Sequence, residues 1–442
     1  MDELLSYQTS LFEKDEAELA LEHAKYHKRS GAFTDNMSLP VHRWFRYSAG
    51  FSADWVRSLV RDQKSEKKEF TVLDPFAGVA TTLLACDAEQ TRSIGFEAHP
   101  FVYRVARAKL SALTLDVSKL RSYFNEFLTE VLSAGEAEPD NEPPLLKKCY
   151  SDKALAYLVT MRTVFEERYA SGSQESEMLW LIITAILRSC STAGTAQWQY
   201  VLPNKKKLHV IDPVMAFRLK AGEALKDIYY AQQHKWTDLG KIVLTDARSP
   251  ECETTFLADS VITSPPYPNN YDYADATRLE MTFWNEISNW GDLQGSVRKY
   301  LIRSCSQHAA AERLSLDDLL KDEILDPIRH ELSEACYRLA DVRLTRGGRK
   351  TYHTMAAAYF KDLGHTFRSL RSLCREGSTM CFVIGDSAPY GIYLDVDTWL
   401  GALAMAVGFK SYTFEKIRDR NLKWKNRKHT VPLKEGRLWI KG

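Results

Sequence analysis

The sequence predicts an α/β fold, an open, doubly wound sheet of seven strands that carries a large helical insertion. Short apolar runs resemble buried strands at residues 70–73, 93–96, 242–244, 261–263 and 380–384. A glycine-bearing turn joins the first of these runs to a helical pattern. At 442 residues the chain is too long for one compact core, so we expect insertions into the sheet.

The order of these patterns divides the chain into six segments. The segments are an N-terminal helical extension (1–40), the first half of the sheet (41–115), the helical insertion (116–239), the next part of the sheet (240–290), a second helical excursion (291–350) and the remaining strands and helices with a basic C-terminal segment (351–442). Charged residues are concentrated between Glu13 and Lys28 in the first segment. The last strand, Arg437–Ile440, is expected at the edge of the sheet.

A strand, a turn and a helix follow one another in the first half of the sheet. Phe70–Leu73 is the strand, and Asp74–Gly78 forms the turn before a helix that contains Thr81 and Thr82. Glycine lets the backbone approach a ligand closely, and the N-terminus of the helix presents unpaired N–H groups. The next strand ends in Glu97, and an acidic residue about 20 residues after such a turn commonly binds ribose hydroxyls.

A second candidate site is the tetrapeptide Ser264-Pro265-Pro266-Tyr267, which follows a later buried strand. The two prolines fix φ, remove two backbone donors and favour extended geometry in the residue before each. Open α/β sheets bind ligands at this edge, beyond the carboxyl ends of their strands. The turn offers a hydroxyl, carbonyls and an aromatic face, which suit a flat base with an exocyclic amine. Taken alone, it would be interpreted as a proline-rich turn capped by a surface tyrosine, since such tetrapeptides recur by chance.

Together these segments resemble a known enzyme family. Asp74–Thr82 resembles the Asp-Pro-Phe-x-Gly-x-Gly-Thr-Thr loop that binds S-adenosylmethionine in DNA amino-methyltransferases, which methylate N4 of cytosine or N6 of adenine. Ser264–Tyr267 is similar to the catalytic loop of that family. Lys241–Arg248 resembles the strand whose terminal acid, here Asp246, binds the adenine amine of the cofactor. Two upstream segments resemble the region that borders its methionine end, namely Trp44–Tyr47 and Phe51–Trp55.

The resemblance implies a Rossmann-like methyltransferase sheet, S-adenosyl-L-methionine as the cofactor and double-stranded DNA as the partner. It assigns catalysis to Ser264, Pro265, Pro266 and Tyr267. It assigns cofactor binding to Phe51, Ser52, Asp74, Pro75, Phe76, Ala77, Gly78, Thr81, Thr82, Glu97, Asp246 and Ala247. The family is associated with restriction–modification, so a cognate restriction endonuclease or another defence-system protein is a further candidate partner. The oligomeric state is not implied.

The serine form of the catalytic loop is associated mainly with N4-cytosine in this family, and the aspartate form mainly with N6-adenine. We therefore expect methylation of N4 of a cytosine flipped out of the duplex. An N6-adenine DNA enzyme and an RNA base amino-methyltransferase stay open. So do a protein glutamine methyltransferase, which usually carries Asn in place of Ser264, and a non-enzymatic DNA-binding relative inactive through Ala80.

One position departs from the family pattern. The second glycine of the cofactor loop is Ala80, whose side chain disfavours a positive φ. Because Thr81, Thr82 and the flanking residues match, we expect the loop to keep a negative φ at Ala80 rather than to lose cofactor affinity.

Composition limits the remaining function classes. The eight cysteines show no CxxC spacing and no Cys/His clustering, so we expect a reducing compartment and no metal site. No signal peptide opens the sequence and no apolar run reaches about 18 residues, so we expect a soluble, cytoplasmic protein without a membrane partner.

Contacts to DNA phosphates must come from local basic clusters, because the formal net charge is only +1. The candidate clusters are Lys205–Lys207 with His209; Arg343, Arg346, Arg349 and Lys350; and Arg418, Arg420, Lys423, Lys425, Arg427 and Lys428. Each could equally be a solvated loop. We expect target recognition first in residues 116–239 and second in residues 290–350, and the sequence does not decide between them.

Overall fold

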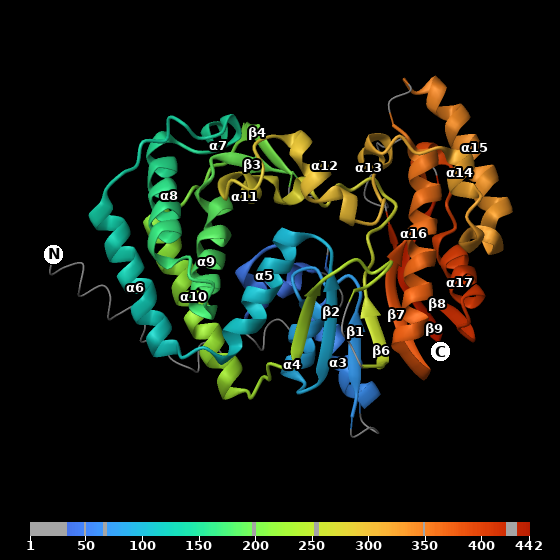
Figure 1. Cartoon of the computed structure of the whole chain (residues 1–442), viewed down its shortest axis with the longest axis horizontal. Helices are drawn as coiled ribbons and strands as arrows, with labels where there is room; N and C mark the ends of the chain where they lie inside the picture. Colours follow the sequence, from blue (N-terminus) through green and yellow to red (C-terminus); the bar gives the residue numbers. More distant parts are fainter. Residues whose placement is uncertain are drawn as a thin grey trace.

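The computed structural model describes residues 33–47, 50–64, 69–196, 200–251, 256–347, 350–420 and 431–442 (Figure 1). Most of the predicted N-terminal extension therefore lies outside the described residues, and its last part contains the short 3-10 helix η1 (Phe33–Ser38). Four basic residues of the third predicted cluster also lie outside them, namely Lys423, Lys425, Arg427 and Lys428.

A seven-stranded, mostly parallel sheet forms the centre of the fold, as predicted. Its strands are β1 (Thr71–Asp74), β2 (Arg92–Glu97), β5 (Gly240–Leu244), β6 (Ala258–Thr263), β7 (Cys374–Gly385), β8 (Ser411–Arg420) and β9 (Leu433–Lys441). They lie in the order β5-β2-β1-β6-β7-β9-β8, and β9 is antiparallel to both of its neighbours.

The prediction of an edge position for Arg437–Ile440 is wrong, because β9 lies between β7 and β8. Leu438 and Ile440 are fully buried and pair with strands on both sides. The outer position belongs to β8, where residues 415–419 are exposed, as suits a strand at an edge.

Helices cover both faces of the sheet, and the alternation of side chains along each strand determines which residues they contact. On one face, Val72 and Ile262 share a core with α3 (Ala53–Lys64). On the other face, their neighbours Leu73 and Val261 share a core with α16 (Tyr352–Leu373). Burial on both faces explains the nearly continuous apolar runs from which the strands were predicted.

The predicted insertion contains helices and also a small hairpin. Its helices are α6 (Val117–Ala134), α7 (Pro144–Cys149), α8 (Asp152–Val164), α9 (Gln174–Cys190) and α10 (Pro213–Gln233). Between α9 and α10, β3 (Ala193–Thr195) and β4 (Val201–Lys206) form a separate two-stranded antiparallel sheet. Helical periodicity did not predict this hairpin.

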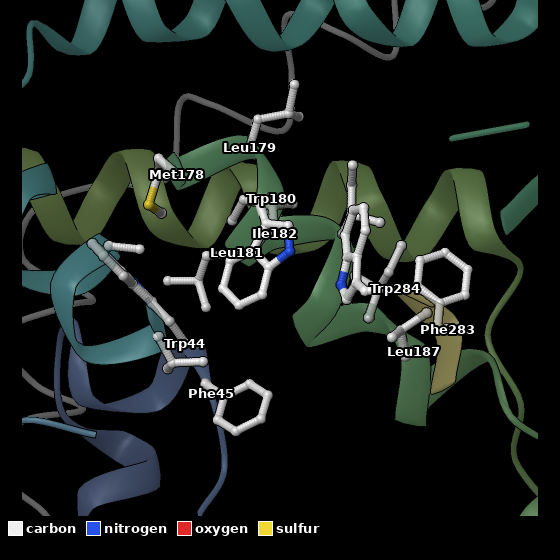
Figure 2. Packing of buried hydrophobic residues seen from close by; sticks show 14 of the residues in the cluster. Trp44, Phe45, Met178, Leu179, Trp180, Leu181, Ile182, Leu187, Phe283 and Trp284 are labelled. Carbon is white, nitrogen blue, oxygen red and sulfur yellow. The ribbon is translucent and has the colours of Figure 1, made fainter. Parts of the chain in front are cut away.

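The insertion packs against the first half of the sheet domain through aromatic side chains. The ring centroid of Trp180, on α9, lies 5.4 Å from that of Phe101 and 5.9 Å from that of Trp284. Phe101 belongs to α5 (Pro100–Ser111), and Trp284 follows α11 (Arg278–Phe283). Figure 2 shows Trp180 in the same cluster as Trp44 and Trp284. The insertion therefore shares one hydrophobic core with the first half of the sheet domain.

The second excursion is helical. Its helices are η6 (Trp290–Asp292), α12 (Leu293–Ser296), η7 (Arg298–Tyr300), α13 (Ser306–Ala311), α14 (Leu316–Leu320), η8 (Glu323–Ile328) and α15 (Arg329–Thr345). The remaining long helices of the sheet domain are α4 (Thr81–Ala88) and α17 (Val396–Ala406). Among the described residues, no helix combines the length and apolarity needed to cross a membrane.

Candidate active site

A pocket lies where the carboxyl ends of β1, β2, β5 and β6 meet. Parallel strands bring their following loops to one edge of the sheet, so predicted segments far apart in sequence converge there. The lining residues are Tyr47, Pro75, Phe76, Gly78, Phe96, Glu97, Ala98, His99, Asp246, Ala247, Ser264, Pro266, Tyr273, Tyr300, Leu301 and Ile302. Both predicted halves, the cofactor loop and the Ser-Pro-Pro-Tyr loop, contribute to this one pocket.

Asp74 connects these two loops from below the pocket. Its Oδ1 accepts hydrogen bonds from Phe76 N at 3.0 Å and from Thr263 Oγ1 at 2.6 Å. Thr263 is the residue immediately before Ser264. Burial raises the pKa of Asp74 to about 6, although these hydrogen bonds oppose the rise. Asp74 is buried and does not line the pocket, so the geometry gives it a part in positioning the loops.

Glu97 is aimed into the pocket by backbone donors. Gly78 N donates to its Oε2 at 2.8 Å, and His99 N donates to its Oε1 at 2.8 Å. Burial raises the pKa of Glu97 to about 7. Each carboxylate oxygen has a second lone pair, which can accept a hydrogen bond from a ligand hydroxyl. Gly78 has a φ of +55°, a conformation that glycine adopts readily.

The expectation of a negative φ at Ala80 is wrong. Ala80 adopts the left-handed conformation, with φ 69° and ψ 33°, directly before α4. The chain turns sharply there, with Ala80 N donating to Ala77 O at 2.9 Å. The loop thus keeps a geometry that glycine tolerates more readily, and a left-handed alanine costs roughly 1–2 kcal/mol. The fully buried side chain lies in the surrounding core.

Besides Asp74 and Ala77, four predicted cofactor residues are absent from the pocket wall. Thr81 is buried in the first turn of α4, and Thr82 Oγ1 donates to Ile262 O at 3.3 Å. Phe51 packs edge-on against Trp55, and Ser52 Oγ accepts from Trp55 N at 3.4 Å.

The upstream segment reaches the pocket through Tyr47 instead of Phe51 and Ser52. The sequence analysis included Tyr47 in a matched segment but did not select it as a site residue. Ala77, also predicted, is buried in the turn, where its N–H donates to Phe96 O at 2.9 Å.

Asp246 and Ala247 line the side of the pocket that follows β5. Asp246 is held by its neighbour, since Arg248 Nε donates to both carboxylate oxygens at 2.9 and 3.0 Å. Arg248 Nη1 also lies 3.1 Å from Asp362 of α16. The orientation of Asp246 therefore depends on Arg248, which the sequence analysis did not select.

The Ser-Pro-Pro-Tyr loop contributes Ser264 and Pro266 to the pocket wall, while Pro265 is buried. Ser264 Oγ donates its proton to Val383 O at 3.2 Å, so lone pairs of Oγ are left to accept other hydrogen bonds. The ring of Tyr267 is half-buried and lies below the guanidinium of Arg420, 5.4 Å from the ring centroid. A Cβ atom at Gly385 would lie 3.0 Å from this ring, so glycine leaves the space for it.

The segment after Tyr267 is held by the two insertions. Tyr200 Oη, from the hairpin, accepts from Asp272 N at 2.7 Å. Asp272 also pairs with Arg298 Nη2 at 2.6 Å. Burial alone would raise the pKa of Asp272, but the neighbouring His308 and Arg298 outweigh it and lower the pKa to about 2.

Asn270 and Tyr271, which follow the Ser-Pro-Pro-Tyr loop in the chain, do not line the pocket. Asn270 Oδ1 accepts from Ser306 N at 2.9 Å and from Ser306 Oγ at 2.6 Å. Tyr271 is buried, and its ring centroid lies 5.6 Å from that of Tyr200. Tyr273 is the member of this segment that lines the pocket.

Asp272, Cys305 and His308 bring three atoms that could bind a metal ion within 4.8 Å of one another. The expected absence of Cys/His clustering is wrong for Cys305 and His308, which lie three residues apart in the sequence and meet Asp272 in the fold. Arg298 already neutralises the Asp272 carboxylate, and burial raises the pKa of the Cys305 thiol to about 12. These contacts favour a buried polar network that holds the loop.

Residues without any recognised motif complete the pocket. Tyr300, Leu301 and Ile302 come from the second excursion, and His99 follows β2. His99 Nε2 lies 3.0 Å from Thr277 Oγ1, and burial lowers the pKa of His99 to about 3. No motif in the sequence marked these four residues.

Comparison with known proteins agrees with this arrangement. Residues 15–108 match the family model described as DNA methylase. The chain is 24% identical to the Type II methyltransferase M.BsoBI of Geobacillus stearothermophilus, across 92% of this chain and 86% of that protein. It is 25% identical to the Type II methyltransferase M.AvaI of Nostoc sp. and of Anabaena variabilis, across 88% of this chain and 83% of each protein. These matches support the resemblance to the DNA amino-methyltransferase family.

Proposed function

We propose that this chain transfers a methyl group from S-adenosylmethionine to N4 of a cytosine flipped out of double-stranded DNA. The observation that carries the proposal is that one pocket is lined by both loops, through Gly78 and Glu97 and through Ser264 and Pro266. The family match and the Type II methyltransferase relatives support DNA as the substrate class.

The pocket residues fit the proposed cofactor. Glu97 offers a carboxyl whose oxygens are fixed by backbone donors, which suits ribose hydroxyls. Asp246 would accept from the adenine amine, while Phe76 and Ile302 supply apolar surface for a flat ring. A Cβ at Gly78 would point toward the ring of Tyr47, 3.8 Å away, so the glycine keeps this part of the pocket open.

The cofactor supplies an activated methyl group on its sulfonium, so the main task of the protein is alignment. Activating the methyl acceptor is the harder part of the reaction, because the lone pair of an aromatic amine is delocalised into its ring. Ser264 Oγ, oriented by Val383 O, and the Pro265 carbonyl would accept hydrogen bonds from the amine. These acceptors favour a pyramidal nitrogen and stabilise the positive charge that develops on it.

The flipped base needs a stacking surface, and Tyr267 would provide it. Flipping a nucleotide out of the duplex costs a few kcal/mol. Stacking on an aromatic side chain contributes about 1–3 kcal/mol and offsets much of that cost. Arg420 holds one face of the Tyr267 ring, so the base would stack on the opposite face.

The choice of N4-cytosine rests on the serine in Ser264-Pro-Pro-Tyr267, and N6-adenine is the alternative. A neutral serine offers fewer acceptor sites than aspartate, yet either can serve either amine. A cytoplasmic location and a restriction endonuclease partner stay predictions.

The substrate class is tested with labelled S-adenosylmethionine and three substrates in parallel: mixed-sequence duplex DNA, tRNA and a protein extract. We expect label to enter DNA alone. Label only in RNA or only in protein would overturn the proposal.

A further inference from the structure

In the hairpin cluster, two lysines carry charges that no described residue neutralises. No ion pair joins Lys205 or Lys206 to another described residue, and both side chains are exposed. In the C-terminal cluster, Arg418 Nη2 pairs with Glu435 at 3.0 Å, and Arg420 Nη1 donates to Asp386 O at 2.8 Å. Those two arginines therefore serve contacts within the fold, whereas the hairpin lysines are available to a partner.

The hairpin is also free of acidic residues. No aspartate or glutamate occurs in residues 178–211, on a chain whose formal net charge is only +1. The segment that follows the lysines is exposed as well, with Leu208 at 95%, Val210 at 41% and Ile211 at 38%. The exposed apolar side chains mark a surface that is open to contact, and the adjacent lysines favour a polyanionic partner there.

The position of the hairpin connects it to the proposed acceptor site. Tyr200, directly before β4, holds Asp272 N at 2.7 Å, five residues after Tyr267. Figure 1 shows β3 and β4 close to α11 and α12, beyond the ends toward which the parallel strands point. DNA that delivers a base to Ser264 would therefore pass near the hairpin.

The outward position of the lysines has a local cause. The β3–β4 register shifts between Ala193 and Gly194, so that Ala193 pairs with Lys206 but Gly194 pairs with Leu202. This bulge leaves Pro203, Asn204 and Lys205 outside the regular ladder. A Cβ at Gly194 would lie 2.9 Å from Lys205 Cβ, so Gly194 allows the bulge to fold over β3. Lys207 Nζ donates to Arg188 O and fixes the end of the strand.

We propose that the β3–β4 hairpin contacts the DNA backbone beside the target base through Lys205 and Lys206. This inference rests on the proposed function and specifies which part of the insertion meets the substrate. Each ammonium would neutralise one phosphate, so these contacts would strengthen binding without selecting the sequence.

The test is the double variant Lys205→Ala/Lys206→Ala of the full chain. We measure its affinity for mixed-sequence duplex DNA, in the presence of S-adenosylhomocysteine, across a range of salt concentrations. Loss of two phosphate contacts is expected to weaken binding about tenfold and to reduce the slope of log K against log salt by about 1.8. Binding of S-adenosylmethionine should not change.

The matched control is Lys153→Ala/Lys226→Ala, which removes two exposed lysines from α8 and α10 of the same insertion. A double variant that binds DNA like wild type, or no worse than this control, would overturn the inference. If the wild-type chain transfers no methyl group to DNA, the proposed function fails and the inference fails with it. If wild type transfers methyl groups normally but the hairpin variant shows an unchanged salt slope, the inference is contradicted and the proposed function is not.

Discussion

The two loops that form the pocket are held in place by different parts of the molecule. The cofactor loop is tied to the ends of neighbouring strands, through Asp74 to Thr263 and through Gly78 to Glu97. The segment after the Ser-Pro-Pro-Tyr turn is tied to the two insertions, through Tyr200 and Arg298. The sheet therefore determines the position of the cofactor loop. The insertions determine the position of the segment that follows the Ser-Pro-Pro-Tyr turn.

This difference suggests that the acceptor side can be disturbed while the cofactor side stays intact. A change in the insertions should alter methyl transfer without altering cofactor affinity. A change at Glu97 should weaken cofactor binding but leave methyl transfer unaltered once the cofactor is saturating.

The largest effect is expected from Arg298→Met, which removes the partner of Asp272. Both side chains are almost fully buried, and breaking such a pair leaves an uncompensated carboxylate that costs about 3–5 kcal/mol. Denaturant unfolding measures the free energy, and the exposed pair Lys321–Asp318 provides a control in Lys321→Ala, which should show no measurable change. A loss below about 1 kcal/mol for Arg298→Met would contradict the anchoring role of this pair.

The next effect is expected at the acceptor groups themselves. Ser264→Ala should lower the transfer rate by about 100-fold or more, as loss of one preorganised polar group does in other active sites. Tyr267→Ala should lower the transfer rate by about 10- to 100-fold, since it removes a stacking contribution of about 1–3 kcal/mol. Calorimetry should find cofactor affinity unchanged in both variants, and Tyr229→Ala, an exposed tyrosine on α10, serves as the control. A parallel loss of cofactor affinity would show that the two sides are not separable.

On the cofactor side, the prediction concerns pH. The pKa of Glu97 is raised to about 7, so its ionised fraction increases about tenfold between pH 6 and pH 8. If ribose hydroxyls bind the carboxylate, cofactor affinity should increase by about the same factor over this range. Glu97→Gln should bind more weakly at pH 8 and should lack this pH dependence. An identical pH profile in the variant would refute the assignment.

The stability of the fold should also depend on the ionisation of Glu97. Cofactor affinity is expected to increase with pH, whereas this contribution to stability is expected to decrease. The folded state holds the Glu97 proton more tightly than the unfolded state, whose pKa is near the ordinary 4.5. The contribution of Glu97 to the free energy of unfolding therefore decreases as pH rises from about 4.5 to about 7.

The smallest effect is expected at Ala80. Glycine there relieves roughly 1–2 kcal/mol of left-handed strain, while greater freedom of the unfolded chain and loss of a buried methyl oppose the gain. Ala85→Gly, at a fully buried position inside α4, removes the same methyl without relieving strain. We expect Ala85→Gly to destabilise the protein by about 1–2 kcal/mol more than Ala80→Gly. Equal unfolding free energies would contradict the strained geometry.

The strand, turn and helix around Asp74–Thr82 could be predicted well from the sequence, because they follow one another along one stretch of chain. Ala80 was the exception, since the surrounding turn imposes a conformation that alanine itself disfavours. The buried strands were predictable because both faces of the sheet are covered. The position of β9 within the sheet could not be predicted, because the residues of a strand do not show which strands lie on either side of it.

The rest of the pocket could not be predicted, because it depends on packing between segments distant in sequence. Ile302 reaches the pocket from the second excursion, and Tyr200 reaches Asp272 from a hairpin that no periodicity marked. Tyr47 stood within a recognised segment, but nothing in the sequence separated it from Phe51.

The most direct test of the account is the chemical identity of the methylated base. Duplex DNA is incubated with the chain and S-adenosylmethionine, digested to nucleosides and analysed by mass spectrometry. The account predicts N4-methylcytosine, formed by wild type and lost in Ser264→Ala. A product methylated on carbon, such as 5-methylcytosine, would contradict the amine chemistry assigned to Ser264-Pro-Pro-Tyr267.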